Sequence, residues 1–234
     1  MLRRSVVLGL AGGLVACASP DPQILSLRAT TLPSDWTWME TAPLAEPFTV
    51  EISFLLRDSF PTDTRGQPKD WPKQPLALPN FDRHERLGAT SWEVEGHVSE
   101  LASYYKAARA QMARYHASDE TLYWLRLGIG GGRSGTTIRF AWWDQLSEME
   151  RFVRWIEEAR DGETFDDLDQ GWRVQAARRG AELFFLDTNW EENEELGKVK
   201  APVATCVEAA KTTWARANSI VDELSRSVGI NPWR

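Results

Sequence analysis

The last part of the chain carries an apolar seam that requires a long packing partner. Pro202 and Gly229 bracket the seam, and these residue types favour the start and the end of a helix. Between them, apolar residues recur at alternating steps of four and three: Val203, Val207, Ala210, Trp214, Ala217, Val221, Leu224 and Val228. The spacing predicts a helix of about 25 residues. Such a helix can pair as a coiled coil, but we expect it to lie across a sheet.

The body before this helix shows two further periodicities. Stripes at steps of three and four predict helices from Ser99 to Tyr115 and from Ser147, whose Ser-Glu-Met-Glu run has the form of a capping box. Apolar residues at every second position predict strands at 48–56, 92–98, 122–127, 136–143, 172–176 and 182–186. Because neighbouring strands follow one another in hairpin order, we expect a single α+β domain. It should have a largely antiparallel sheet packed by about three helices.

Composition limits the classes of partner. The chain has 234 residues, is 42% hydrophobic and 26% charged, and carries a formal net charge of −7. This is ordinary globular composition, but an acidic surface repels phosphate backbones, so we expect no nucleic-acid partner. Twelve tryptophans are many for this length. Because tryptophan is enriched at interfaces as well as in cores, their number favours a binding surface without locating it.

The amino-terminal residues carry an export pattern. Arg3 and Arg4 precede an apolar stretch from Val6 to Ala16, which is too short to span a bilayer. The stretch runs into Leu14-Val15-Ala16-Cys17, which resembles the lipobox of bacterial lipoproteins. The resemblance implies cleavage before Cys17 and attachment of fatty acyl chains such as palmitate to that residue. Ala18 in the next position implies sorting to the outer membrane. The two arginines leave both general secretory and twin-arginine export open.

The resemblance divides the chain into three parts. Residues 1–16 form a signal peptide, residues 17–47 hold the lipidated cysteine and a proline-rich tether, and residues 48–234 form the globular domain. With Cys17 acylated, Cys206 is the one remaining thiol, so no intramolecular disulfide can form. We expect Cys206 to be a buried structural thiol.

No catalytic or cofactor motif is complete. The glycine-rich stretch 128–135 lacks the Lys-Ser or Lys-Thr of a phosphate-binding loop and is predicted to be a hairpin turn. Gly132 to Thr136 misses the serine-hydrolase pattern by one position. Glu93, Glu95 and His97 share one face of the strand predicted there and could hold a divalent ion, but alternating polar residues are also typical of a solvated strand face. The acidic stretches 161–169 and 191–195 lack calcium-loop spacing and are predicted to be solvated loops. We therefore predict neither enzyme activity nor a metal or cofactor.

These features together favour a binding protein. The hypothesis is an outer-membrane lipoprotein that faces the periplasm and acts as a non-enzymatic protein-binding module of inhibitor or immunity type. A structural or assembly lipoprotein of an envelope or secretion complex is the alternative, and a hydrolase or small-ligand carrier with a deep polar pocket is a third. Aromatic anchors ringed by acids would bind the partner. The partner-binding residues predicted on this basis are Trp71, Phe81, Arg133, Trp190, Glu191 and Glu192.

Overall fold

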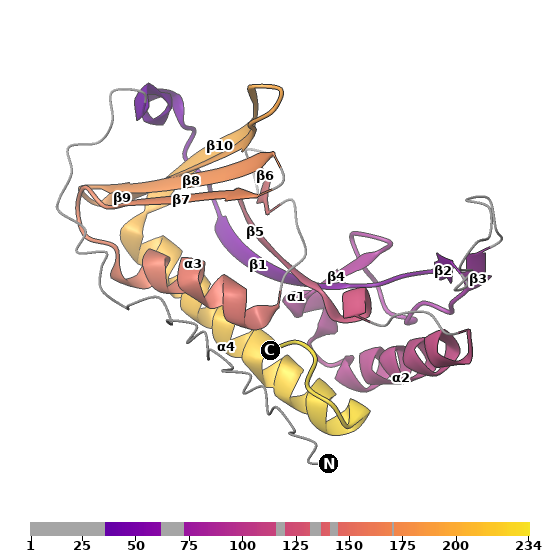
Figure 1. Cartoon of the computed structure of the whole chain (residues 1–234). Coiled ribbons are helices and arrows are strands. Elements are labelled where there is room, and N and C mark those ends of the chain that lie inside the picture. The colour runs from indigo at the N-terminus through magenta and orange to yellow at the C-terminus, as the bar shows by residue number, and fades with distance from the viewer. Residues whose placement is uncertain (1–35, 62–72, 116–119, 132–136, 141–144, 170) are drawn as a thin grey trace, which may run out of the picture.

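A computed structural model gives the fold of the chain. It describes residues 36–61, 73–115, 120–131, 137–140, 145–169 and 171–234 (Figure 1). The predicted lipidation site Cys17 and two predicted partner-binding residues, Trp71 and Arg133, lie outside the described residues.

Two antiparallel sheets of four strands form the body. The first has the order β4-β1-β5-β6 and the second is a meander with the order β10-β9-β8-β7. The strands of the first sheet are β1 (Phe48–Leu55), β4 (Gly88–Thr90), β5 (Leu125–Gly131) and β6 (Thr137–Arg139). Those of the second are β7 (Thr164–Asp169), β8 (Trp172–Arg179), β9 (Glu182–Asn189) and β10 (Glu194–Pro202). A short pair, β2 (Ser59–Pro61) and β3 (Lys73–Pro75), stands apart.

The helices cover the apolar sides of these sheets. They are α1 (Ser91–Val94), α2 (Val98–Arg114), α3 (Leu146–Glu158) and α4 (Val203–Val228), with 3-10 turns η1 (Trp36–Thr41) and η2 (Glu120–Tyr123). Figure 1 shows α3 and α4 below the sheets and α2 at the far end of α4. The architecture confirms the predicted α+β domain with antiparallel hairpins and a long C-terminal helix, although the strands form two large sheets.

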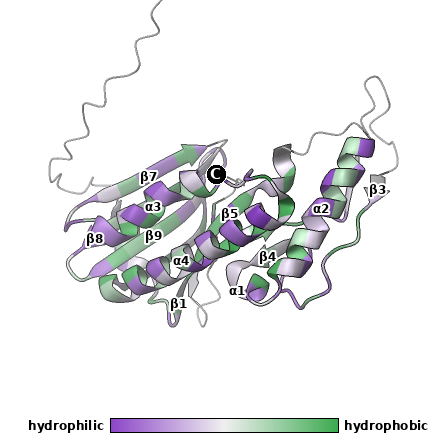
Figure 2. Ribbon diagram, turned by 90° about the horizontal axis from the view of Figure 1, so that it is seen from below, coloured by the Kyte–Doolittle hydropathy of each residue, from purple (hydrophilic) through white to green (hydrophobic). Residues whose placement is uncertain are grey.

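Helix α4 joins the two sheets into one core. It lies below both sheets in Figure 1 and on the near side of the molecule in Figure 2, which is seen from below. Its buried residues belong to the same hydrophobic cluster as those of β1, β5, β8 and β9. The buried face of the helix consists of Cys206, Ala210, Thr213, Ala217, Ile220, Val221 and Leu224, and α4 contacts α2 and α3 as well as β1. This face is turned slightly from the predicted seam, so that Val207 and Trp214 are only half-buried. Cys206, Ala210, Thr213 and Ala217 are small and allow the helix to approach its neighbours closely, while the half-buried Trp214 packs against the hydrophobic cluster.

The strand predicted at residues 92–98 is wrong. Those residues form α1, a turn, and the start of α2. Local hydrogen bonds decide this: Glu93 N donates to Thr90 Oγ1 at 3.3 Å, and Thr90 N donates to Glu93 Oε2 at 2.7 Å. This reciprocal capping box begins a helix. Gly96, with φ of +84°, then allows the chain to turn into α2.

The acidic loops predicted at 161–169 and 191–195 are also partly wrong. Residues 164–169 form the edge strand β7, and β10 begins at Glu194. An edge strand exposes one face and one row of backbone groups, so its acidic residues remain solvated while its backbone pairs with β8. The capping box predicted at Ser147 is wrong as well. Helix α3 begins at Leu146, after Gln145, whose side chain makes no capping bond.

Part of the predicted glycine turn is strand. Gly128 to Gly131 belong to β5, which pairs with β1 on one side and β6 on the other. The predicted hairpin of 122–127 with 136–143 is therefore present but shifted along the sequence. The second predicted hairpin is confirmed and extended as β8 and β9.

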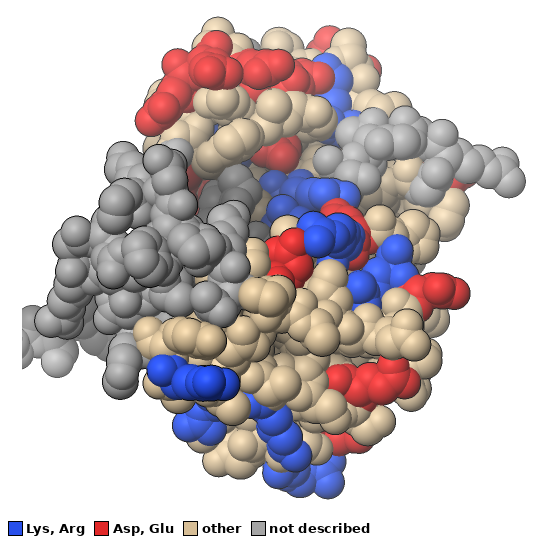
Figure 3. Space-filling model, turned by 90° about the vertical axis from the view of Figure 1, so that its right-hand side faces the viewer, with Lys and Arg blue, Asp and Glu red and all other residues tan. Residues whose placement is uncertain are grey.

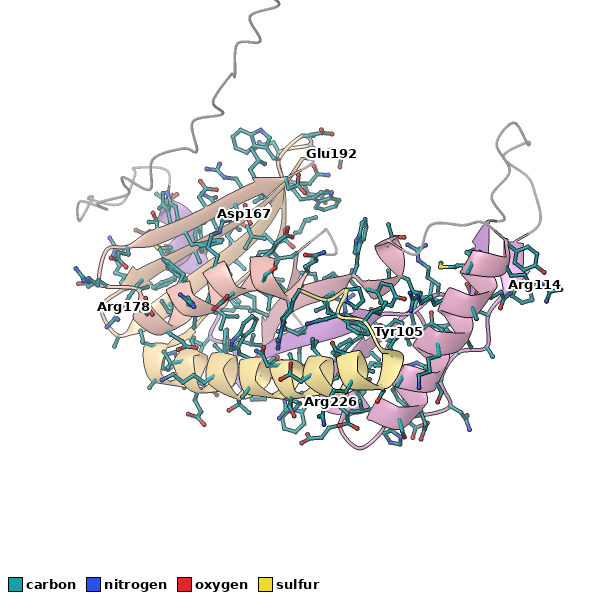
Figure 4. The ribbon with its side chains drawn as sticks, turned by 60° about the horizontal axis from the view of Figure 1, so that its bottom comes forward. Tyr105, Arg114, Asp167, Arg178, Glu192 and Arg226 are labelled. Carbon is teal, nitrogen blue, oxygen red and sulfur yellow. The ribbon has the colours of Figure 1, made fainter. Side chains whose placement is uncertain are left out.

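The C-terminal tail is fastened to the core by a tryptophan. Trp233 is fully buried, and its ring meets the rings of Tyr105 and Tyr123 edge-on at 5.3 and 5.2 Å. Its carbonyl oxygen accepts a hydrogen bond of 2.8 Å from Leu146 N at the start of α3. Tyr105, labelled in Figure 4, donates from its hydroxyl to the carbonyl of Leu55 in β1.

We predict that Trp233→Ala lowers the free energy of unfolding by about 3–5 kcal/mol, because it opens a large cavity in the core. Urea unfolding followed by circular dichroism measures the change. Trp190→Ala removes a tryptophan that is 53% exposed and serves as the matched control, with an expected loss of less than about 1 kcal/mol. Equal losses in the two variants would contradict the assignment of Trp233 to the core.

Candidate functional site

The first sheet has a polar face with a hollow in it. Along β1, Thr49, Glu51 and Ser53 alternate with the buried apolar residues and lie on the opposite face. Glu51 is paired in register with Gly128 of β5, which is paired in turn with Arg139 of β6. Because Gly128 and Gly130 have no side chains, the surface is recessed beside Glu51. The recess, here called the polar cavity, has a volume of about 300 Å³.

A carboxylate bridges two arginines in the wall of the polar cavity. Glu85, from the segment before β4, accepts hydrogen bonds from Arg126 Nη2 at 3.1 Å and pairs with Arg139 Nη1 at 2.5 Å. Burial lowers the pKa of Arg126, while the charge of Glu85 acts in the opposite direction. Charged groups of both signs therefore line one hollow. Figure 3 shows basic and acidic side chains meeting in the middle of one face of the molecule, below a group of acidic side chains.

Glu93 in the same cavity is fully engaged. Its Oε1 accepts from His84 N at 2.5 Å and lies 2.8 Å from His84 Nδ1, and its Oε2 accepts from Thr90 N and from Thr90 Oγ1. Burial alone would raise the pKa of Glu93, but the hydrogen bonds from Thr90 and His84 outweigh it and lower the pKa. This carboxylate holds the segment before α1 in place.

Glu51 differs from Glu85 and Glu93 in having an unsatisfied oxygen. Its Oε2 is buried and makes no hydrogen bond with any described residue. Burial raises the pKa of Glu51 to about 7. The positive charge of Arg216 lowers this pKa, and the negative charge of Glu93 raises it further. Paired carboxyls with divergent pKa values are typical of acid–base catalysis. Here, however, the four hydrogen bonds on Glu93 leave it no capacity to act as the partner of Glu51, so the pair is better suited to binding.

A second hollow lies on the other side of β1. This apolar groove has a volume of about 560 Å³ and runs between β1, α1 and the first half of α4. It is lined by Phe48, Thr49, Val50, Glu51, Trp92, Ala204, Thr205, Glu208, Ala209, Thr212 and Thr213. Thr213 Oγ1 donates to the carbonyl of Val50 at 2.6 Å and fixes the helix against the strand at the floor. Thr49 and Glu51 line both hollows, so the two adjoin across β1.

Trp92 stands at the rim of the apolar groove, and its side chain is held in place. The residue is 56% exposed, and the guanidinium carbon of Arg216 lies 3.5 Å from its ring centroid. Arg216 Nε in turn donates to Glu95 Oε2 at 3.1 Å. A cation over a tryptophan face is a favourable contact. The ring is thus presented to solvent by a guanidinium that is itself fixed by a carboxylate.

The turn between β9 and β10 repeats this arrangement. Trp190 is 53% exposed, and the guanidinium carbon of Arg173 lies 4.8 Å from its ring centroid. Arg173 Nε donates to Asp166 Oδ1 at 2.7 Å. Glu191 and Glu192 follow on the same turn and are exposed, and Figure 4 shows Glu192 at its tip. Three of the predicted partner-binding residues, which are consecutive in the chain, are thus exposed on one turn.

The predicted anchor Phe81 lies elsewhere. Its ring is half-buried, stacks on His97 at 5.0 Å and lies under Arg83 at 5.2 Å. Sequence reasoning also missed Glu51, Trp92 and Arg216. The alternation of β1 placed Glu51 on the polar face of that strand. No sequence signal brought Trp92 next to Arg216, which is 124 positions away.

The carboxylates and histidine considered for a metal ion are dispersed. Glu93 binds Thr90 and His84, Glu95 pairs with Arg216, and His97 Nδ1 lies 3.0 Å from Glu100. Across the described part of the chain, no group of three His, Cys, Asp or Glu side chains is placed to hold a metal ion. Cys206 is buried as predicted, and burial raises its pKa to about 12, so its thiol stays protonated at neutral pH.

Comparisons of the chain with protein-family models, with curated proteins and with solved structures found no significant match. Among the described residues, no helix combines the length and the apolar character needed to cross a membrane. The two hollows and the exposed tryptophans are therefore the features that bear on function.

Asp187 of β9 is bonded to the backbone of Arg139, which lines the polar cavity, and its burial makes the stability of the fold depend on pH. The residue is 5% exposed, and its Oδ2 accepts a bond of 3.4 Å from Arg139 N. Its Oδ1 has no partner among the described residues. Burial raises its pKa to about 6, and the bond from Arg139 N only partly offsets this. The folded state therefore binds the proton more tightly than the unfolded state, and stability falls as pH rises from about 4 through 6.

We predict that Asp187→Asn is more stable than the native chain at pH 8 by about 1–2 kcal/mol, because the amide is not ionised. The difference should vanish toward pH 4, where the native carboxyl is protonated. Urea unfolding at pH 4.5 and 8 measures it, and Asp82→Asn at an exposed position controls for the loss of one charge. A gain that is equal at both pH values would contradict the ionisation argument.

Proposed function

We propose that the mature chain is a lipid-anchored protein of the outer membrane that binds another protein in the periplasm without catalysing a reaction, as an inhibitor or immunity-type protein does. The observation that carries the proposal is the pair of exposed tryptophans, Trp92 and Trp190, each stacked by an arginine that a carboxylate holds. Tryptophan and arginine dominate binding hot spots. Because these side chains are already ordered, binding loses less conformational entropy.

The charge of the chain supports a basic partner. Trp190 is followed by the exposed acids Glu191 and Glu192 on the turn and by Glu194 and Glu195 at the start of β10. Acids around an aromatic anchor speed association with a basic surface and reject acidic ones. The engaged state of Glu93 supports binding rather than acid–base chemistry. The alternative, an assembly lipoprotein of an envelope or secretion complex, would use the same surfaces on a resident envelope protein.

The location is tested at Cys17. We predict that the native chain incorporates labelled palmitate and fractionates with the outer membrane. Cys17→Ser should abolish labelling and leave the precursor uncleaved, because the lipid is attached through the thiol. Cys206→Ser, at a buried thiol, is the matched control and should keep the label. Recovery of the native chain without acyl chains in the cytosolic fraction would contradict the proposed location.

Binding is tested by cross-linking in cells. We predict that a photoreactive amino acid at Glu192 captures one protein in stoichiometric amount, and that the same group at Arg226 on the exposed side of α4 captures none. A captured toxin or secreted effector would support the inhibitor, whereas a resident envelope protein, with a weakened envelope on loss of the gene, would support the assembly role. Absence of any stoichiometric protein product both at Glu192 and at Thr205, which lines the apolar groove with Trp92, would contradict the proposed function.

A further inference from the structure

We propose that the apolar groove and the polar cavity form one docking site for an extended segment of the partner in which apolar and basic side chains alternate. The inference rests on the proposed protein-binding function and goes beyond it by naming the site and the chemistry of the occupant. Two features support it: the two hollows adjoin, and the charged groups that line them are mostly acidic.

The apolar groove suits large side chains. Trp92 forms one rim, and Phe48 with Ala204 and Ala209 of α4 gives apolar surface. Arg216 stacks on Trp92 and is held by Glu95, so the rim is preorganised. The volume lies within the roughly 300–1,000 Å³ that is typical of binding pockets. An apolar side chain that enters the groove is removed from water against a fixed tryptophan face.

The lining charge favours a cation. Four carboxylates line the two hollows, and two arginines accompany them in the polar cavity: Glu51, Glu85, Glu93 and Glu208, with Arg126 and Arg139. Glu85 engages both arginines. Glu51 retains a carboxylate oxygen that has no hydrogen bond within the described structure. A Lys or Arg side chain placed over Gly128 and Gly130 supplies the missing donor and the opposite charge.

The junction of the hollows sets the pattern of the segment. In an extended chain, successive side chains point to opposite sides. A segment lying over Thr49 and Glu51 therefore sends one side chain into the apolar groove and the next into the polar cavity. Thr213 already occupies the carbonyl of Val50 at the groove floor. Recognition therefore rests on side chains in the two hollows rather than on the addition of a strand to β1.

The test is a selection of random twelve-residue peptides, displayed on phage, against the full-length lipoprotein in detergent micelles. We expect enriched peptides in which Lys or Arg alternates with Leu, Ile, Phe or Trp. Synthetic copies should bind Trp92→Ala and Glu51→Gln at least tenfold more weakly than the native chain, and Arg226→Ala, at an exposed position of α4 outside both hollows, equally well. Trp190→Ala, at the other exposed tryptophan stacked by an arginine, shows whether a peptide docks at the β9–β10 turn instead.

A second variant guards against an indirect effect of removing Trp92. Thr205→Arg places a cation at an exposed position of α4 that lines the apolar groove, and it should also weaken binding at least tenfold. Thermal unfolding of each variant verifies the fold.

The proposal is overturned if enriched peptides lack basic residues, if none depends on Trp92 and Glu51, or if no peptide is enriched. Peptides that lose affinity only for Trp190→Ala would move the docking site to the β9–β10 turn. That result would overturn this inference and leave the protein-binding function intact. In cells, a cross-linked partner at Glu192 together with none at Thr205 would separate the two proposals in the same way.

Discussion

The packing of α4 beneath both sheets is the interaction on which the rest of the structure depends. Each sheet has an apolar face that must be covered, and this one helix contributes to covering both. Ala210 and Ala217 keep the helix close to the strands, and the bond from Thr213 to the carbonyl of Val50 fixes its position along β1. With the apolar face of β1 covered from below, its other face, which carries Glu51, is left for solvent and for a ligand.

The sequence predicted the elements whose periodicity is long and regular. The 3.6-residue pattern identified α2 and α4, and the alternation of β1 and of the β8–β9 hairpin identified those strands. The pattern failed where an element is short or where few of its residues are buried in the core. β7 lies at a sheet edge, so its acids remain in water and conceal the strand. In α1, the capping bonds between Thr90 and Glu93 outweighed a weak alternation.

The candidate site was harder to predict because it depends on register. The glycines of β5 indicated a flexible turn in the sequence, whereas pairing with β1 places Gly128 directly beside Glu51 and turns the missing side chains into a cavity. The stacking of Arg216 on Trp92 depends on where α4 crosses α1, which no local pattern contains. Trp190 and its acids were accessible to sequence reasoning because they are consecutive.

The carboxyls around the polar cavity divide between structure and binding. Glu85 and Glu93 accept hydrogen bonds that join separate segments, and their removal would loosen the walls. The buried Oε2 of Glu51 makes no hydrogen bond to the residues that the structure describes, and the raised pKa of Glu51 means that its ionisation at neutral pH opposes folding. An uncharged residue at this position would stabilise the sheet more. Local choices that oppose stability concentrate at functional sites, and a partner's cation beside Glu51 would reverse the penalty by making its ionised form the favoured one.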